Sequence, residues 1–152
     1  MSRFWVVFGM GLLAAGLLGC EEVFDDDFIF EQDFQFTEPA EGLVTLDLRT
    51  HNGAVDVRGV GTDEVDIRAF RYVRARDETD GRRYARDVEA DVRVEGDTLV
   101  VRTVLPVGSP PSYVEEVRID YDIMLPDDME VRVLTDNGAV EVVAVDENVR
   151  IR

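Results

Sequence analysis

The chain has 152 residues, of which 33 are Asp or Glu and 16 are Arg, with no Lys, one His and one Cys, so its formal net charge is −17. This length and a hydrophobic content of 45% allow one domain with an ordinary core. The single cysteine excludes a disulfide scaffold and a multi-cysteine metal cluster. The excess of acid argues against a nucleic-acid partner, which requires a basic face.

The first 20 residues have the pattern of an export signal that ends in a lipidation site. Arg3 precedes an apolar stretch, Phe4–Gly19, that is shorter than the roughly 20 residues of a membrane span. The sequence Leu17-Leu18-Gly19-Cys20 resembles the lipobox of bacterial lipoproteins. In that family the cysteine is acylated and becomes the first residue after cleavage. We therefore expect residues 1–19 to be removed and Cys20 to carry lipid; the alternative is an ordinary signal peptide or an anchor helix.

The lipid anchor predicts a place in the cell envelope. In enterobacterial lipoproteins an aspartate after the cysteine retains the protein at the inner membrane, and this chain has Glu21 instead. By resemblance to that rule we expect the outer membrane, on its periplasmic or surface side. The acidic body should be repelled by anionic headgroups, so the lipid tethers it to the membrane and it does not lie on the surface.

Residues 20–33 form an acidic segment that includes Asp25-Asp26-Asp27. A run of like charge favours a solvated tether, and a metal-binding cluster is the alternative. The alternating sequence Phe34-Gln35-Phe36 then predicts the first strand. We expect the β domain to occupy residues 34–152.

Within that domain most segments alternate apolar and charged residues, which is the period of β-strands with one buried face. Examples are Val44–Leu48, Val88–Val94 and Val117–Ile123. Acids and arginines alternate on the outward positions, which suits cross-strand ion pairs. Two segments break the pattern. We expect Arg76–Arg86 to be a loop or a single helical turn, solvated or in contact with an anion, and Gly108–Ser112 to be a loop.

Two segments, Leu48–Arg68 and Val133–Arg152, repeat each other at an offset of 85 residues. Thr50 matches Thr135, and the match continues through Asn52-Gly53-Ala54-Val55 with Asn137-Gly138-Ala139-Val140, then Val65 with Val149 and Ile67 with Ile151. Asn-Gly tolerates positive φ and turns the backbone sharply. A hairpin is one outcome. The other outcome is a corner between successive strands of a solenoid, and the repetition of the Asn-Gly segment favours this corner.

The repeat resembles the bacterial putative-adhesin domain of β-strand repeats, also called the toastrack domain. The likeness rests on Thr50–Gly59, on Thr135–Val142 and on the order of the segments between them, and it covers about residues 34–152. It implies an all-β fold: a right-handed β-solenoid or β-roll-like stack of short strands with Asn-Gly corners, often behind a lipobox. Family members usually continue with several more repeats, so the stop at Arg152 implies either a truncated version or an uncapped last strand.

Residues that commonly carry catalysis are scarce in this sequence. His51 is the only histidine, and because Asp136 takes its place in the second repeat we interpret His51 as a turn residue. Ser109 and Ser112 lie beside prolines in a loop, and lipid occupies the thiol of Cys20. The sequence contains no calcium loop and no phosphate-binding glycine loop. The resemblance brings no catalytic residues either, and we expect no metal and no cofactor.

The sequence therefore predicts a lipid-anchored module of the cell envelope that acts by binding, in adhesion, scaffolding or sensing, without catalysis. The residues singled out are Cys20 for lipidation and Asn52, Gly53, Asn137 and Gly138 as structural turns. The expected partners are the membrane, through Cys20, and a protein or polysaccharide on the β-surface. The alternative is a carboxylate- or metal-dependent hydrolase on a β-solenoid, which an acidic groove with several carboxylates around a cation would favour.

Overall fold

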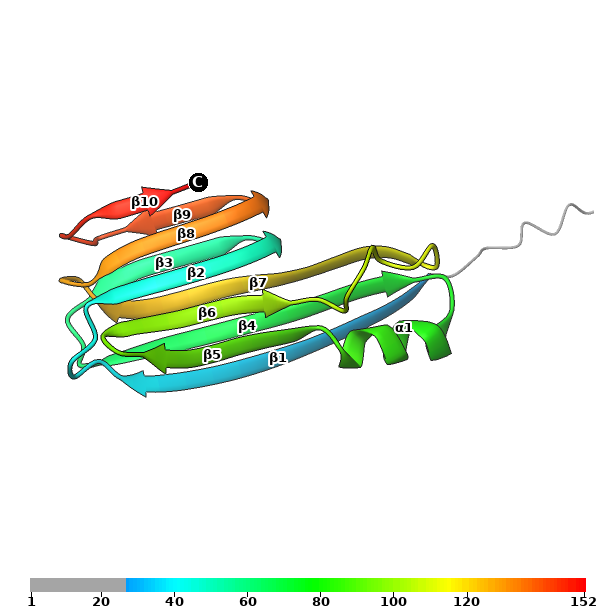
Figure 1. Cartoon of the computed structure of the whole chain (residues 1–152), viewed down its shortest axis with the longest axis horizontal. Helices are drawn as coiled ribbons and strands as arrows, with labels where there is room; N and C mark the ends of the chain where they lie inside the picture. The colour runs from blue at the N-terminus through cyan, green and yellow to red at the C-terminus, as the bar shows by residue number, and fades with distance from the viewer. Residues whose placement is uncertain (1–26) are drawn as a thin grey trace, which may run out of the picture.

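The computed structural model describes residues 27–152, so Cys20 and the signal segment lie outside the described residues (Figure 1). The described chain is mostly β-structure, as the alternating pattern predicts, with one short helix. In chain order the elements are β1 (Phe28–Pro39), β2 (Thr45–Asn52), β3 (Val55–Val60), β4 (Glu64–Ala75), α1 (Glu78–Arg86), β5 (Glu89–Glu95), β6 (Thr98–Val104), β7 (Val114–Pro126), β8 (Glu130–Asn137), β9 (Val140–Val143) and β10 (Val149–Ile151).

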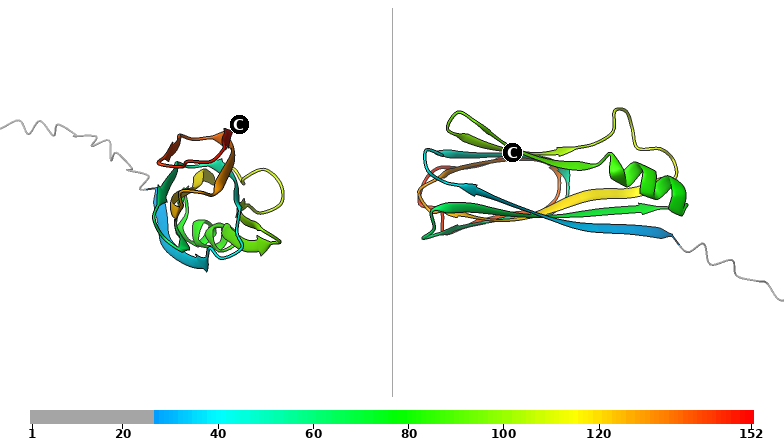
Figure 2. Two further views of the ribbon diagram at one scale, coloured as in Figure 1. Left: turned by 90° about the vertical axis from the view of Figure 1, so that its left-hand side faces the viewer. Right: turned by 90° about the horizontal axis from the view of Figure 1, so that it is seen from below.

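The strands form two mixed sheets that face each other across the core (Figure 2). The first sheet has the order β1-β4-β7-β3-β9, and the second has the order β10-β8-β2-β6-β5. The chain crosses from the second sheet to the first between β2 and β3 and again between β8 and β9. Each crossing is one of the two Asn-Gly corners.

The two sequence repeats lie side by side and in register. β2 runs parallel to β8, with Thr45 opposite Glu130 and Asn52 opposite Asn137. β3 runs parallel to β9, with Val55 opposite Val140. The same offset of 85 residues therefore holds in both sheets, and the paired residues of β2 and β3 lie beside their counterparts in β8 and β9.

The stack departs from the expected solenoid in two ways. β2 and β3 lie between β6 and β7 on one side and β8 and β9 on the other, so neighbouring layers do not follow chain order. β1, β4 and β5 pair antiparallel with their neighbours. A solenoid is not identified among residues 27–152. The architecture of these residues is two mixed sheets.

The repeat also ends earlier than the sequence match suggests. Val65 and Ile67 lie in β4, in the first sheet, whereas Val149 and Ile151 lie in β10, in the second sheet. The sequence match beyond the first two strands of each repeat therefore does not correspond to equivalent positions. Val65 and Ile67 are buried, whereas Val149 and Ile151 are exposed, so the two pairs also differ in environment.

The expectation of a loop or single turn at residues 76–86 is wrong, because Glu78–Arg86 form α1, a helix of nine residues. Asp77 caps it by accepting a hydrogen bond from the Asp80 backbone N–H at 2.9 Å. Only Gly81, Tyr84 and Ala85 of this helix are buried. α1 packs against β1 and β4, which extend with β7 beyond the shorter stacked strands (Figure 1). Among the described residues no helix is long and apolar enough to cross a membrane.

β1 begins at Phe28 and pairs along its whole length with β4, so it includes residues 28–33, which the sequence analysis assigned to the acidic tether. Its alternate residues Phe30, Phe34 and Phe36 pack on the core. The core is made of the inward-facing residues of both sheets, and its largest fully buried side chains are Tyr121, Leu46, Leu48, Ile67, Leu99, Ile119, Ile123, Leu125 and Met129.

Candidate functional site

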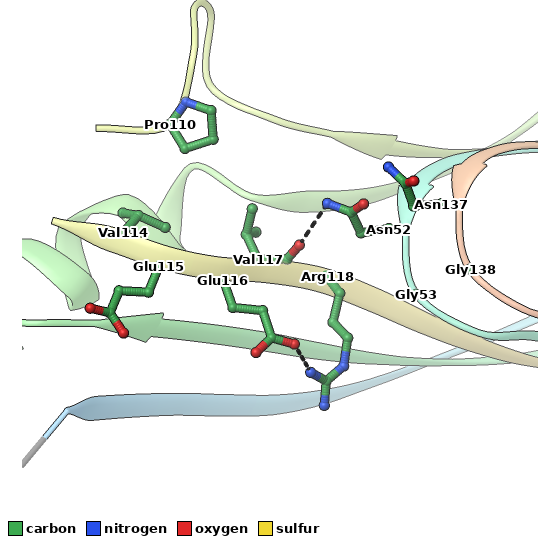
Figure 3. A pocket seen from close by; sticks show the side chains of 10 residues that line it. All are labelled: Asn52, Gly53, Pro110, Val114, Glu115, Glu116, Val117, Arg118, Asn137 and Gly138. Atoms are coloured by element: carbon green, nitrogen blue, oxygen red, sulfur yellow. Dashed lines mark hydrogen bonds and ion pairs between the residues drawn. The ribbon is translucent and has the colours of Figure 1, made fainter. Parts of the chain in front are cut away.

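The corners of the two repeats open into one groove, which we name the corner groove (Figure 3). Its volume is about 460 Å³. Both Asn-Gly pairs line it, together with the first part of β7 and one proline of the preceding loop. The lining residues are Asn52, Gly53, Pro110, Val114, Glu115, Glu116, Val117, Arg118, Asn137 and Gly138.

Glycine is required at both corners for two reasons. Gly53 has φ of 124° and Gly138 has φ of 144°, values that L side chains rarely adopt. The backbone of the next layer also comes very close. A Cβ at Gly53 would lie 2.2 Å from the Ile119 carbonyl oxygen, and one at Gly138 would lie 2.0 Å from the Gly53 carbonyl oxygen. Without glycine the layers could not approach closely enough to form the groove.

The asparagines bring two carboxamides to the groove. The Asn52 Nδ2 donates a hydrogen bond to the Val117 carbonyl oxygen at 3.3 Å, which joins β2 to the wall formed by β7. Asn137 occupies the register-paired position on β8, beside Asn52 (Figure 3). A carboxamide both donates and accepts hydrogen bonds, so this edge of the groove can satisfy a neutral polar ligand.

The charged residues of β7 turn away from the two asparagines. Figure 3 shows Glu115, Glu116 and Arg118 on one side of β7, and Val114 and Val117 on the other, with Val117 nearest Asn52 and Val114 nearer Pro110. A β-bulge explains why two successive glutamates share a side, since the register with β4 shifts between Glu116 and Val114. The inner wall of the groove is therefore apolar.

Ion pairs hold these charges on the outer face of the first sheet. The Arg76 Nε donates to the Glu115 Oε1 at 3.2 Å, and the Arg118 Nε donates to the Asp120 Oδ2 at 3.2 Å. The Arg118 guanidinium also lies over the Tyr72 ring, 4.0 Å from its centroid. These contacts hold the charged side chains on the side of β7 that is turned away from the asparagines.

His51 is not a turn residue, because it lies in β2, and its repeat counterpart is its direct partner. The His51 Nδ1 and the Asp136 Oδ2 are 2.7 Å apart. Parallel pairing in register explains the contact, since it puts each residue beside the one that replaces it in the other repeat. Both side chains are more than half exposed, so the pair contributes little to stability.

Several polar groups form a hydrogen-bonded chain in the core, away from the corner groove. The Tyr121 hydroxyl lies 2.9 Å from the Thr103 Oγ1, which in turn lies 3.0 Å from the Thr50 Oγ1. Burial raises the pKa of Tyr121 to about 12. Among residues 27–152 no three His, Cys, Asp or Glu side chains are arranged to hold a metal ion.

The sequence analysis identified the corner residues but missed the groove wall. The alternating pattern of β7 is readable from Val117 onward, and the bulge interrupts it at Glu115 and Glu116. Two glutamates in succession before an alternating strand were the available signal. Without knowing that β7 lies beside β3, that signal could not be connected to the Asn-Gly corners.

No protein-family model matches this chain, and no curated protein matches it in sequence. Solved structures that it resembles include a "putative cell adhesion protein" from Clostridium sporogenes, with a TM-score of 0.49 and 10% identity over 80% of this chain and 57% of that chain. A "putative adhesin" from Parabacteroides merdae has a TM-score of 0.42 and 6% identity over 75% of this chain and 39% of that chain. This chain spans less than two thirds of either protein, and likenesses of this size do not bear on what it binds.

Proposed function

We propose that this protein is a lipid-anchored module of the cell envelope that acts by binding a neutral polar ligand in the corner groove, without catalysis. The observation that supports the proposal is the lining of that groove. Asn52 and Asn137 present carboxamides beside an apolar wall that includes Val114 and Val117. Such a lining can hydrogen-bond sugar hydroxyls or peptide amides and cover their apolar parts.

The same lining favours a binding function over a catalytic one. Acid–base and covalent catalysis require a titratable or nucleophilic group that faces the ligand. The charged residues at this groove, Glu115, Glu116 and Arg118, are on the far side of β7 from the asparagines. Adhesion, scaffolding and envelope sensing all fit a module of this kind.

We propose the membrane attachment from the sequence alone. A diacylglyceryl group on Cys20 would hold the protein firmly, since each buried CH₂ contributes about 0.8 kcal/mol. Glu21 after the cysteine favours delivery to the outer membrane. In the Cys20→Ser variant the precursor should stay uncleaved and lack the mass of the acyl groups. Normal processing of that variant would contradict the lipid anchor.

We also propose that the two repeats are coils of a right-handed β-solenoid-like stack. The parallel, in-register pairing of β2 with β8 and of β3 with β9 supports this description. The handedness follows from the resemblance to the toastrack domain. The interleaved order of the layers is then a local variation on that stack.

Filling the corner groove tests the binding proposal. The full-length protein is immobilised and screened against a panel of neutral oligosaccharides and short peptides. Val114→Trp places a large ring in the groove and should weaken binding of any ligand found by at least about tenfold, which corresponds to about 1.4 kcal/mol. Val94→Trp is the matched control, because Val94 is a half-exposed valine on β5, away from the groove.

The outcomes separate the possible functions. Binding that survives Val114→Trp, or no binding across the panel, would contradict the corner groove as the site. The same panel is analysed for products by mass spectrometry, with Ca²⁺, Mg²⁺ or Zn²⁺ added. Cleavage that a single Asp or Glu substitution abolishes would overturn the binding function in favour of a hydrolase.

A further inference from the structure

The outer face of the second sheet carries a second, chemically different surface. Two adjoining grooves there, of about 440 and 230 Å³, share Arg49 and Leu134 as lining residues. We name the combined surface the arginine groove. It is lined by Arg49, Arg102, Arg132, Arg150 and Arg152, with two carboxylates, Asp47 and Asp136, and by His51, Thr50, Thr103, Val133 and Leu134. Arginines outnumber acids there, in a chain with twice as many acids as arginines.

Strand register brings these arginines together. Arg49 on β2 lies directly opposite Arg102 on β6, and Arg132 on β8 lies directly opposite Arg150 on β10. Like charges at directly opposed positions destabilise a sheet. Glu130 partly neutralises the second pair, since its carboxylate lies 2.9 Å from the Arg132 Nη2 and 3.7 Å from the Arg150 Nε. An anionic ligand would reduce the remaining repulsion in both pairs.

The guanidinium groups retain unused donors. Arg49 donates from its Nε at 3.2 Å and its Nη2 at 3.3 Å to the Asp47 carboxylate. Arg132 donates from its Nε at 3.1 Å and its Nη2 at 2.9 Å to the Glu130 carboxylate. Each guanidinium has five N–H donors, and these two side chains are about half exposed. Among the described residues the buried Arg102 Nε has no hydrogen-bond partner. The ion pairs therefore orient the arginines without satisfying them.

We propose that the arginine groove binds a linear polysaccharide that carries carboxylates, such as a polyuronate. The guanidinium fork matches a carboxylate with two parallel hydrogen bonds. Asp47 and Asp136 would accept hydrogen bonds from sugar hydroxyls, whereas they would repel a polymer that offers only phosphate. Leu134 is 43% exposed between the arginines and can cover the apolar face of a sugar ring.

Other polyanions fit this surface less well. An anionic membrane or a nucleic acid would meet the net charge of −17 over a broad contact, whereas a single polysaccharide chain would meet mainly the groove. An acidic peptide strand would pair through its backbone with the edge strand β10, because β2 and β8 are already paired on both sides, so it would lie beside the groove and not across it. This surface differs from the corner groove, so either proposal can fail without the other.

The test compares oligogalacturonate with its fully methyl-esterified form, which has the same sugar backbone without the charge. Full-length protein is titrated with each by calorimetry at low and high salt. The acidic form should bind, with an affinity that falls as salt rises, and the ester should not. Arg49→Gln combined with Arg102→Gln should weaken binding at least about tenfold, or about 1.4 kcal/mol. Arg150→Gln, at a side chain that is 66% exposed, should weaken it without affecting the fold.

The control variant is Arg82→Gln with Arg83→Gln, which removes the same charge from α1, where Glu78 and Asp80 pair with these arginines. It should bind within about twofold of the unmodified protein, well under 1 kcal/mol. Equal weakening in the control, or equal binding of the methyl ester, would overturn the proposal. So would the absence of binding to oligogalacturonate and to alginate. Inorganic polyphosphate is titrated as well. If it binds as tightly as the polyuronate, and the same groove variants abolish that binding, the groove is a general anion site and the polysaccharide proposal is wrong.

Discussion

Gly53 and Gly138 are the residues on which the corner geometry depends most. Alanine at either position would have to adopt a strongly disfavoured φ and would place its Cβ against backbone of the next layer. We expect each of Gly53→Ala and Gly138→Ala to lower the free energy of unfolding by more than about 3 kcal/mol. Denaturant unfolding of the full-length protein measures the change.

The variant Gly96→Ala separates the cost of the positive φ from the cost of the clash between the Cβ and the neighbouring backbone. Gly96 also has positive φ, 66°, but a Cβ there would meet no atom within 4 Å. That variant should lose only about 1 to 2 kcal/mol, the cost of the backbone conformation. Equal losses at Gly96 and Gly53 would show that the close approach of the layers is not a constraint.

Tyr121 predicts how stability depends on pH in the alkaline range. Burial raises its pKa to about 12 in the folded protein, whereas the unfolded chain titrates near the ordinary tyrosine value of about 10. Between these values the unfolded state binds fewer protons, so the free energy of unfolding falls as pH rises through this window. The stabilisation is complete below pH about 10 and is lost by about 12, at most about 3 kcal/mol.

Unfolding experiments at a series of alkaline pH values, with Tyr121→Phe as comparison, test this prediction. The variant lacks the titrating hydroxyl, so most of the decline over the same window should disappear. An unchanged decline in Tyr121→Phe would assign it to other groups, of which Tyr84 is one, because burial raises its pKa as well.

Some residues could be placed from the sequence and others could not. The Asn-Gly dipeptide has a backbone preference of its own, so its corners were predictable. The burial of Arg71 was not predictable, because Arg71 occupies an inward position of β4 where the alternating pattern predicts an apolar residue. It is 6% exposed, donates to the Val88 carbonyl and to Gln32, and lies over the Phe30 and Phe34 rings. Those partners come from distant parts of the chain.

At the scale of the element, α1 depends on its N-cap. The Asp77 carboxylate accepts the hydrogen bond of the Asp80 backbone N–H at 2.9 Å. We expect Asp77→Ala to lower the free energy of unfolding by about 1 kcal/mol, and Asp77→Asn to change it by only a few tenths, because asparagine caps equally well. Thermal unfolding followed by circular dichroism compares the two. A similar loss in both variants would mean that charge, and not capping, matters at this position.

The strands were more predictable than the helix because their period is visible in the sequence. Alternation places Val117, Ile119, Tyr121 and Ile123 on one face, and all four are buried. In α1 the buried set is only Gly81, Tyr84 and Ala85, and the other positions are charged or polar, so no apolar stripe marks the helix. Its support comes from β1 and β4, which sequence alone could not bring beside it.

At the scale of the whole molecule, the offset of 85 residues organises both grooves. It places Asn52 beside Asn137 at the corner groove, and Arg49 beside Leu134 at the arginine groove. It also makes the contact between His51 and Asp136. The repeat was visible in the sequence, but its interleaving with β6 and β7 was not, because that arrangement depends on pairing between strands far apart in the chain.

The register of the two repeats can be measured directly by cross-linking the variant Arg49→Cys/Leu134→Cys. These positions are paired on neighbouring parallel strands, whose backbones are about 4.8 Å apart, within the range of about 4.4 to 6.8 Å that a disulfide spans between Cα atoms. Under mild oxidation of the full-length protein, peptide mass spectrometry should find a disulfide between residues 49 and 134. The control variant Arg49→Cys/Val143→Cys, with residue 143 on β9 in the opposite sheet, should form none within one molecule. A disulfide in the control, or none in the paired variant, would contradict the stacked repeats on which both grooves depend.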